Sequence, residues 1–198
     1  MAAVVSDTRE TVLDVAERLV QARGFNGFSY ATIAAEVGLT KAALHYHFAT
    51  KAALGTALIR RYADRFGDAL ARIESEQRAP YERLVAYTRL YATVLSEQRM
   101  CLCGMLAAEY HTLPGDMRRA VLDFFDLNYA WLVRVLEAGR EDSSLAFPGV
   151  ALAAAQMIVG TLEGAMLTSR PYADPARFDA VAAQLLAELS RPADLPAC

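Results

Sequence analysis

The feature that most constrains this chain is Gly38, which lies close to the junction of two short segments with helical patterns, residues 30–39 and residues 40–48. Ala34 and Gly38 are four residues apart, and Leu44 follows six residues later. A helix-turn-helix needs this arrangement, because a small residue lets the helices touch, a glycine allows the turn and an aliphatic side chain anchors the second helix. The spacing therefore predicts a helix-turn-helix whose second helix is free to enter a DNA major groove.

A pair of core helices that meet at a glycine is the alternative, and the residues around the turn favour the helix-turn-helix. These residues are Gly24, Phe25, Ile33, Ala34, Val37, Gly38, Leu39, the run Leu44–Phe48, Lys51 and Leu54. Through them the chain resembles the TetR family of transcriptional regulators, closely over residues 8–55 and only in length and helical layout beyond them. The resemblance implies an all-α fold with a three-helix helix-turn-helix head, expected in residues 1–50, and a body that binds an effector and dimerises, expected in residues 51–198.

The pattern of apolar residues and helix caps predicts about nine helices. No segment alternates polar and apolar residues with a period of two, as a half-buried strand would. The expected N-terminal caps are Asp7, in a capping box with Glu10, and then Ser29, Thr40 and Thr50. Gly139 is expected to end a helix that begins near Pro114, and residues 143–148 are expected to open another that runs to about Ser169.

Composition and charge agree with a small DNA-binding part on a larger globular protein. Hydrophobic residues make up 55% of the 198 residues and charged residues 22%, which excludes a disordered chain. The net charge of −3 is unevenly divided, since residues 1–65 hold eight Lys or Arg and six Asp or Glu, whereas residues 66–198 hold twelve and seventeen. A mildly basic N-terminal part suits local binding of phosphate.

The sequence also indicates a cytoplasmic protein that does not partner a membrane. Its first residues lack the basic and apolar regions of a signal peptide. The most apolar run, Val150–Leu162, is too short to span a bilayer. Three cysteines fit reduced thiols better than a disulfide framework.

The candidate DNA-binding residues follow from the family pattern. They are Ser29, Tyr30, Thr40, Lys41, Ala42, Ala43, His45, Tyr46, His47 and Lys51. Hydroxyls and lysines bind phosphate, and small alanines let a helix approach base edges. For each histidine the alternative is packing against the head, and residues two apart on a helix do not share a face for a metal. Lys51 in the first turn of a helix is unfavourable to the helix dipole unless it binds a phosphate there.

A second group of residues forms the candidate effector pocket. It consists of Tyr87, Tyr91, Cys101, Cys103, Met105, Glu109, His111, Asn128, Trp131, Gln156 and Met157. Aromatic and methionine side chains suit an adaptable apolar cavity, and ordinary core packing is the alternative for each. For Cys101 and Cys103 three interpretations stay open: burial or pocket lining, a zinc site with His111, and the electrophile sensing by cysteine that occurs in some members of the family.

The third group is a candidate dimer interface in the last two helices. It consists of Ala153, Gly160, Gly164, Phe178, Val181 and Leu185. A glycine inside a helix costs about 1 kcal/mol relative to alanine, so Gly160 and Gly164 need a reason such as close helix contact. In the family these two helices form a four-helix dimer interface; close packing within one chain is the alternative.

Together these features predict a homodimeric TetR-type regulator, a repressor rather than an activator, that binds a palindromic operator and is released by a small-molecule effector. One rival is a small helical enzyme that uses Glu109, His111 and the cysteines. Another is an adaptor that no longer binds DNA. The chain has no HExxH motif, nucleotide-binding glycine motif or nucleophile elbow, so we expect no catalytic activity, no metal and no cofactor.

Overall fold

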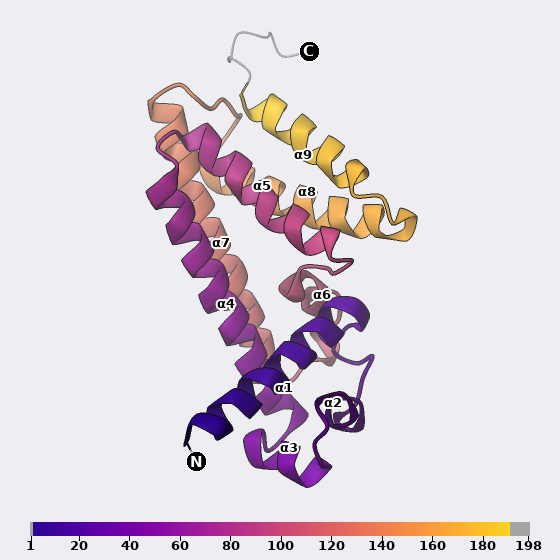
Figure 1. Cartoon of the computed structure of the whole chain (residues 1–198). Helices are drawn as coiled ribbons and strands as arrows, with labels where there is room; N and C mark the ends of the chain where they lie inside the picture. Colours follow the sequence, from indigo (N-terminus) through magenta and orange to yellow (C-terminus); the bar gives the residue numbers. More distant parts are fainter. Residues whose placement is uncertain (1, 191–198) are drawn as a thin grey trace. The chain divides into compact units, whose positions relative to one another are not determined.

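The computed structural model describes residues 2–190, with side chains from Thr8 onward, and these residues form nine α-helices, two 3-10 helices and no β-strand (Figure 1). The elements are α1 (Ala2–Arg23), α2 (Tyr30–Val37), α3 (Lys41–His47), α4 (Lys51–Glu76), α5 (Pro80–Ser96), α6 (Leu102–Ala108), η1 (Tyr110–Thr112), α7 (Gly115–Glu141), α8 (Ala151–Ser169), η2 (Arg170–Tyr172) and α9 (Ala176–Leu189). The expected all-α fold is confirmed.

The chain divides into two compact units, and each takes residues from separate stretches of sequence. The N-terminal unit contains the residues up to Arg65 together with Arg99–Phe125. The C-terminal unit contains Phe66–Gln98 and the residues from Asp126 onward. Each of the long helices α4 and α7 therefore contributes to both units. The placement of α6, η1 and the start of α7 with the DNA-binding helices has no signal in the sequence.

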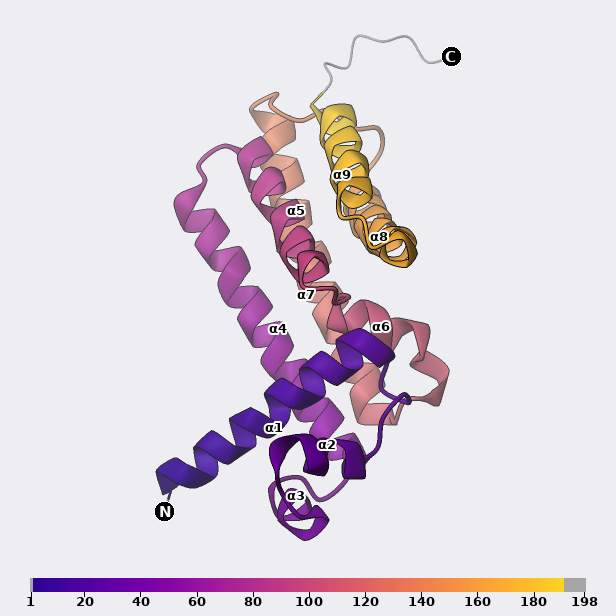
Figure 2. The ribbon, with the colours of Figure 1, turned by 45° about the vertical axis from the view of Figure 1, so that its right-hand side comes forward.

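In the N-terminal unit, α1 packs against α2 and α6, and α2 packs against α3 (Figure 2). The apolar face of α1 is fully covered, with Val12, Ala16 and Val20 at 0% exposure. These residues recur every four positions, so they lie on one side of the helix. Ile33 of α2 and Leu44 of α3 are also buried, and they help to fix α2 against α1 and α3 against α2.

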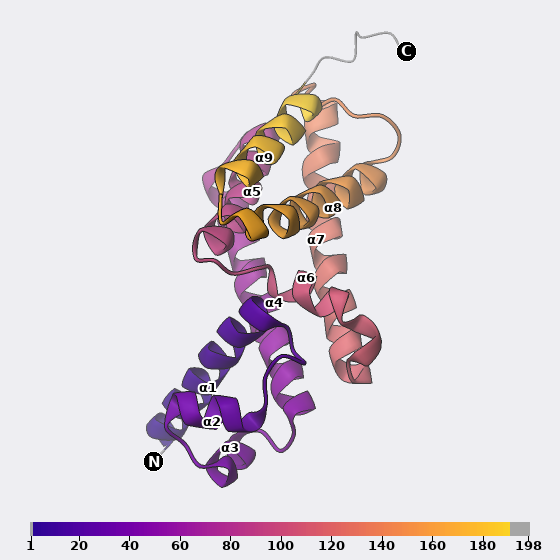
Figure 3. The same cartoon turned by 90° about the vertical axis from the view of Figure 1, so that its right-hand side faces the viewer.

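In the C-terminal unit, α8 packs against α9 and α5, and α5 also contacts α9 (Figure 3). By length and composition, Ala151–Tyr172 is the one described stretch that is apolar enough to cross a membrane. Its inner residues lie in the protein core, including Ala155, Leu162 and Met166 at 0% exposure. This burial is typical of the core helix of a globular unit.

Three expected helix boundaries are wrong. α1 begins at Ala2 rather than after a cap at Asp7, because no proline or glycine interrupts the preceding residues. Gly139 lies inside α7, where a Cβ would come within 2.4 Å of Leu145 Cδ1, so the glycine makes room for that side chain. Residues 143–148 form a loop, and α8 starts only at Ala151.

Candidate nucleic-acid interface

The turn between α2 and α3 has the geometry of a helix-turn-helix. Gly38 ends α2 in the left-handed conformation, with φ at 74°, which glycine adopts without strain. Ala34 is 4% exposed and Leu44 0%, so the small contact residue and the aliphatic anchor both lie in the core. The expected helix-turn-helix is confirmed.

Hydroxyl side chains cap the N-terminal ends of α2, α3 and α4, as expected. Ser29 caps α2 in a capping box with Thr32, each side chain accepting from the other residue's backbone N–H at 3.3 Å. The Thr40 Oγ1 accepts from Ala43 N at 3.1 Å, and the Thr50 Oγ1 accepts from Ala53 N at 3.0 Å. These bonds satisfy N–H groups that the helices leave without internal partners.

The outer face of α3 carries the side chains that are free to meet DNA. Lys41, Ala42, His45 and Tyr46 are exposed, and Tyr46 is the most exposed large hydrophobic side chain of the described residues at 79%. Ala43 and His47 are half-buried, and the His47 ring packs edge-on against Tyr46 at 5.4 Å. A cation, a hydroxyl and a small alanine on one short helix suit phosphate and base-edge contacts.

Two of the candidate DNA-binding residues hold the C-terminal end of α3 in place. The Tyr30 hydroxyl donates to the Phe48 carbonyl at 2.8 Å, and burial raises the pKa of Tyr30 to about 12. The His45 ring stands edge-on to Tyr30 at 4.8 Å, and its Nδ1 lies 3.1 Å from the Ala49 carbonyl. These contacts connect α2 to the residues that follow α3.

Lys51 binds the protein's own backbone. Its Nζ donates to the Phe25 and Phe28 carbonyls and lies 4.4 Å and 4.3 Å from the centres of their rings. Burial lowers the pKa of Lys51, and the negative charge of Glu109 opposes that effect. The cation at the start of α4 is therefore compensated without a phosphate, and the phosphate contact stays a prediction.

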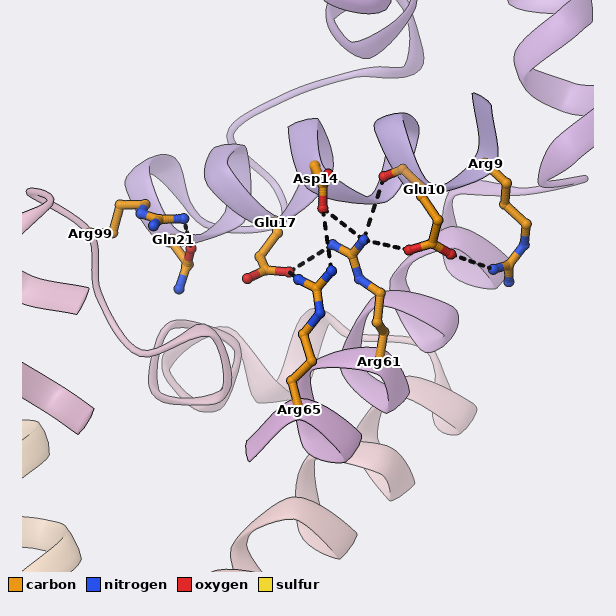
Figure 4. A network of polar contacts seen from close by, with 8 residues as sticks. All are labelled: Arg9, Glu10, Asp14, Glu17, Gln21, Arg61, Arg65 and Arg99. Atoms are coloured by element: carbon orange, nitrogen blue, oxygen red, sulfur yellow. Dashed lines mark hydrogen bonds and ion pairs between the residues drawn. The ribbon is translucent and has the colours of Figure 1, made fainter. Parts of the chain in front are cut away.

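An ion-pair network on α1 and α4, which sequence reasoning missed, holds the start of α4 (Figure 4). Arg61 of α4 contacts Glu10 at 3.0 Å, Asp14 at 2.8 Å and Glu17 at 2.8 Å. Arg65 adds weaker pairs to Asp14 and Glu17 at 3.7 Å and 3.4 Å. The signal was present, because Glu10, Asp14 and Glu17 recur at helical spacing and so lie on one face of α1, where basic residues of a neighbouring helix can pair with them.

The candidate effector residues fall into three groups along the fold. Cys101, Cys103, Met105, Glu109 and His111 belong to the N-terminal unit, and Tyr87, Tyr91, Asn128 and Trp131 to the C-terminal unit. Gln156 and Met157 lie on the exposed side of α8. Periodicity along the chain gave no information on which unit each residue enters.

The group in the C-terminal unit is a buried polar cluster beside a cavity. The Tyr87 hydroxyl donates to Asn128 Oδ1 at 2.9 Å and lies 3.0 Å from the Tyr91 hydroxyl. The Trp131 ring stacks on Tyr87 at 5.5 Å, and its buried Nε1 has no hydrogen-bond partner among the described residues. Trp131 also lines a groove of about 400 Å³ with Gly67, Leu70, Ala71, Glu74, Leu127, Ala130 and Arg134.

The cysteines are packing residues in this structure. Cys101 is 2% exposed and Cys103 0%. The Cys101 Sγ accepts from Gly104 N at 3.5 Å and from the Tyr62 hydroxyl at 3.9 Å. Arg99, which precedes the two cysteines, donates to Gln21 Oε1 at 3.1 Å. Within residues 2–190 no three His, Cys, Asp or Glu side chains are grouped to hold a metal, and His111 is exposed.

The candidate interface residues on α8 and α9 are partly exposed. Ala153 and Gly160 are exposed and Gly164 is half-buried, and a Cβ added to either glycine would have no neighbour within 4 Å. Packing within the chain therefore does not explain these two glycines. On α9, Val181 is 38% exposed, whereas the other two candidate interface residues, Phe178 and Leu185, lie in the core.

A helix-turn-helix with an exposed polar face, joined to a larger helical unit, defines a DNA-binding regulator. The family model described as "Bacterial regulatory proteins, tetR family" matches residues 12–58. The model described as "Tetracyclin repressor-like, C-terminal domain" matches residues 80–185. The chain belongs to the TetR family and is a TetR-type transcriptional regulator.

Known proteins agree with this assignment along most of the chain. The chain is 29% identical over 168 residues to the HTH-type transcriptional repressor NemR of Escherichia coli K12, which covers 83% of this chain and 84% of NemR. A TetR-family regulator from Agrobacterium tumefaciens has a TM-score of 0.91 at 31% identity, covering 94% of this chain and 100% of that one. The reduced form of Escherichia coli NemR has a TM-score of 0.82 at 28% identity, covering 94% and 99%.

Proposed function

We propose that the protein is a homodimeric cytoplasmic repressor that binds a near-palindromic operator with α3 and is released by a small-molecule effector. Residues 1–50 bind the DNA and residues 51–198 bind the effector and dimerise. The observation that carries the proposal is the face of α3, where Lys41, Ala42 and Tyr46 are exposed while Leu44 anchors the helix from behind. Similarity to a protein named as a transcriptional repressor supports repression rather than activation.

The substitution Ala42→Glu tests the assignment of α3. A carboxylate on its exposed face opposes the phosphates and base edges, so we expect specific affinity to fall about a hundredfold or more, toward the non-specific level. The probe is the duplex that the wild-type protein selects from a random pool. Ala79→Glu, directly before α5, is the matched control, since Ala79 is also exposed and the charge change is the same. A folded Ala42→Glu variant that binds like wild type excludes α3 as the recognition helix.

Dimerisation is supported by the surface of α8. Met157 and Leu167 are 47% and 61% exposed beside the two open glycines, which together form an apolar stripe along one side of the helix. A second copy of the chain would cover this stripe and place two α3 helices against successive major grooves, roughly 34–36 Å apart. Both α8 and α9 offer this surface through Ala153, Gly160, Gly164 and Val181.

The groove beside Trp131 is the proposed effector site. Its lining is mostly apolar, and the Arg134–Glu74 ion pair at 3.2 Å adds two charges to it. The buried Trp131 N–H suits a ligand with a hydrogen-bond acceptor, because an unmatched buried donor is costly. An effector lowers operator affinity only if it binds the DNA-free state more tightly.

The contacts of Glu109, His111 and the two cysteines support catalysis and thiol sensing less well than the proposed regulation. The Glu109 carboxylate is engaged by backbone N–H groups at 2.6 Å and 3.3 Å, and His111 is exposed. Cys101 and Cys103 are buried, whereas an electrophile sensor needs an accessible thiolate. We therefore propose a regulator without a catalytic step, and an inert role for both thiols.

A further inference from the structure

The turn between α1 and α2, residues 24–29 (the α1–α2 turn), is held by a carboxylate that lies 84 residues further along the chain. Glu109 directly follows α6, and its Oε2 accepts from Phe25 N at 2.6 Å. Its Oε1 lies 3.3 Å from Asn26 N, and the Asn26 Nδ2 donates to Thr112 Oγ1 at 2.8 Å. Hydrogen bonds from backbone N–H groups to a charged acceptor are among the stronger ones in proteins.

The α1–α2 turn is shaped to receive this carboxylate. Gly24 has φ at +78°, and a Cβ there would lie 2.7 Å from Glu109 Oε1. Phe25 and Phe28 are 6% and 8% exposed, so their rings fix the turn against the core. A side chain at Gly24 would therefore displace the Glu109 carboxylate, and the left-handed backbone there strains any residue other than glycine.

Lys51 holds the same turn from the other side. Its Nζ donates to the Phe25 and Phe28 carbonyls, so Phe25 has its N–H bound by an anion and its C=O bound by a cation. Glu109 and Lys51 also attract each other electrostatically. The two charges thus hold one short segment of backbone between residues of α4 and residues that follow α6.

The position of the turn matters for DNA binding because it leads directly into α2. Ser29, its last residue, is the N-cap of α2, and α2 packs against α3. We propose that Glu109 is a positioning residue for operator binding, through which the segment 102–112 controls the orientation of α2 and α3. Displacement of that segment removes the carboxylate from the turn and lowers operator affinity, with no contact between Glu109 and DNA.

The expected loss of operator affinity follows from the fraction of molecules in which the α1–α2 turn is in place. Apparent affinity falls in proportion to that fraction, so a loss of the carboxylate that leaves one molecule in ten competent weakens binding about tenfold. The charge change alone acts in the opposite direction, because removing an anion from a DNA-binding protein strengthens its attraction to phosphate. Whether operator affinity falls or rises when the carboxylate is lost therefore distinguishes a positioning role from a simple charge effect.

Glu109→Gln is the test, with Asp123→Asn as its matched control. Both substitutions remove one negative charge and keep the side-chain size, and Asp123 is exposed on α7 in the same unit. For the duplex selected by the wild-type protein, we expect Glu109→Gln to bind about tenfold more weakly and Asp123→Asn to bind equally or more tightly. Binding to a random duplex of the same length should not weaken in either variant. Equal changes in affinity for the selected duplex in the two variants would overturn the proposal.

Hydrogen exchange of the DNA-free protein gives a second readout. Exchange at the Phe25 and Asn26 amides should accelerate about tenfold or more in Glu109→Gln, while α8 and α9 keep their wild-type protection. Faster exchange throughout the chain, with a lowered Tm, would make Glu109 a general stability residue and overturn the positioning role. The inference rests on operator binding by α3, and a wild-type protein that selects no duplex would refute that function while the exchange experiment still decides the role of Glu109.

Discussion

At the scale of single residues, the DNA-binding head depends on side chains that bind its own backbone. The Tyr30 hydroxyl and the Lys51 amine both donate to carbonyls, of Phe48 in one case and of Phe25 and Phe28 in the other. Lys41 and Tyr46, by contrast, extend from the exposed face of α3. Residues of the same chemical type therefore divide between those that bind the backbone of the head and those that are exposed on α3.

The salt dependence of binding distinguishes these two roles for lysine. Lys41→Ala should reduce the slope of log K against log salt by about 0.9, because one phosphate contact is lost. Lys51→Met keeps most of the aliphatic stem and removes the donors to the turn. It should weaken binding with an unchanged slope, as measured by fluorescence anisotropy from low to moderate salt. A slope reduced as much as in Lys41→Ala would place Lys51 on a phosphate.

At the scale of elements, α1 and α4 are joined by a partly buried guanidinium. The Arg61 side chain is 12% exposed and its partner Glu17 13%. Burial alone would lower the pKa of Arg61, but hydrogen bonds to Glu10 and Glu17 and the charges of Glu17 and Asp14 raise it overall. Because α4 belongs to both compact units, this network fixes α1 to a helix that continues into the C-terminal unit.

Arg61→Met should destabilise the protein far more than Arg65→Met. The first substitution leaves the buried Glu17 without its closest cation, which costs about 2 kcal/mol. Arg65 is 54% exposed, and its loss should cost about 0.5 kcal/mol, as for surface pairs. Urea unfolding at one protein concentration measures both values. Equal costs for the two variants would mean that Arg61 is solvated rather than structural.

At the scale of the whole molecule, the open stripe on α8 is the surface on which we propose dimerisation. A Cβ at Gly164 meets no atom of the described residues within 4 Å, apart from the backbone of its own helix, so we expect the folded monomer to tolerate a leucine there. In a dimer packed on this stripe the added side chain prevents close approach. Gly164→Leu should therefore shift the protein to monomer by light scattering. Gly115→Leu is the control, since Gly115 is equally open but lies on α7. An unchanged dimer in Gly164→Leu would move the interface elsewhere.

Local chemistry alone specified the fold class and the helix-turn-helix. The caps at Ser29, Thr40 and Thr50 depend on atoms three residues away, and the Gly38 turn depends on one backbone conformation. Such short-range interactions are fully contained in the sequence, so the position of the recognition helix and its exposed residues was predictable. The helix end expected at Gly139 could not be judged from local chemistry, because that glycine accommodates Leu145 rather than ending a helix.

The roles of Glu109, Lys51 and Arg61 depend on partners that only the tertiary structure brings together. Glu109 was predicted to line an effector pocket, and in the structure its carboxylate binds a turn 84 residues away in sequence. Lys51 was expected on phosphate and binds carbonyls 26 and 23 residues away. A charged side chain near a helix end has the same local pattern whether its partner is a ligand or a distant backbone group. Which of these it meets is decided by the packing of α1, α4 and α6, since that packing determines the groups within hydrogen-bonding distance.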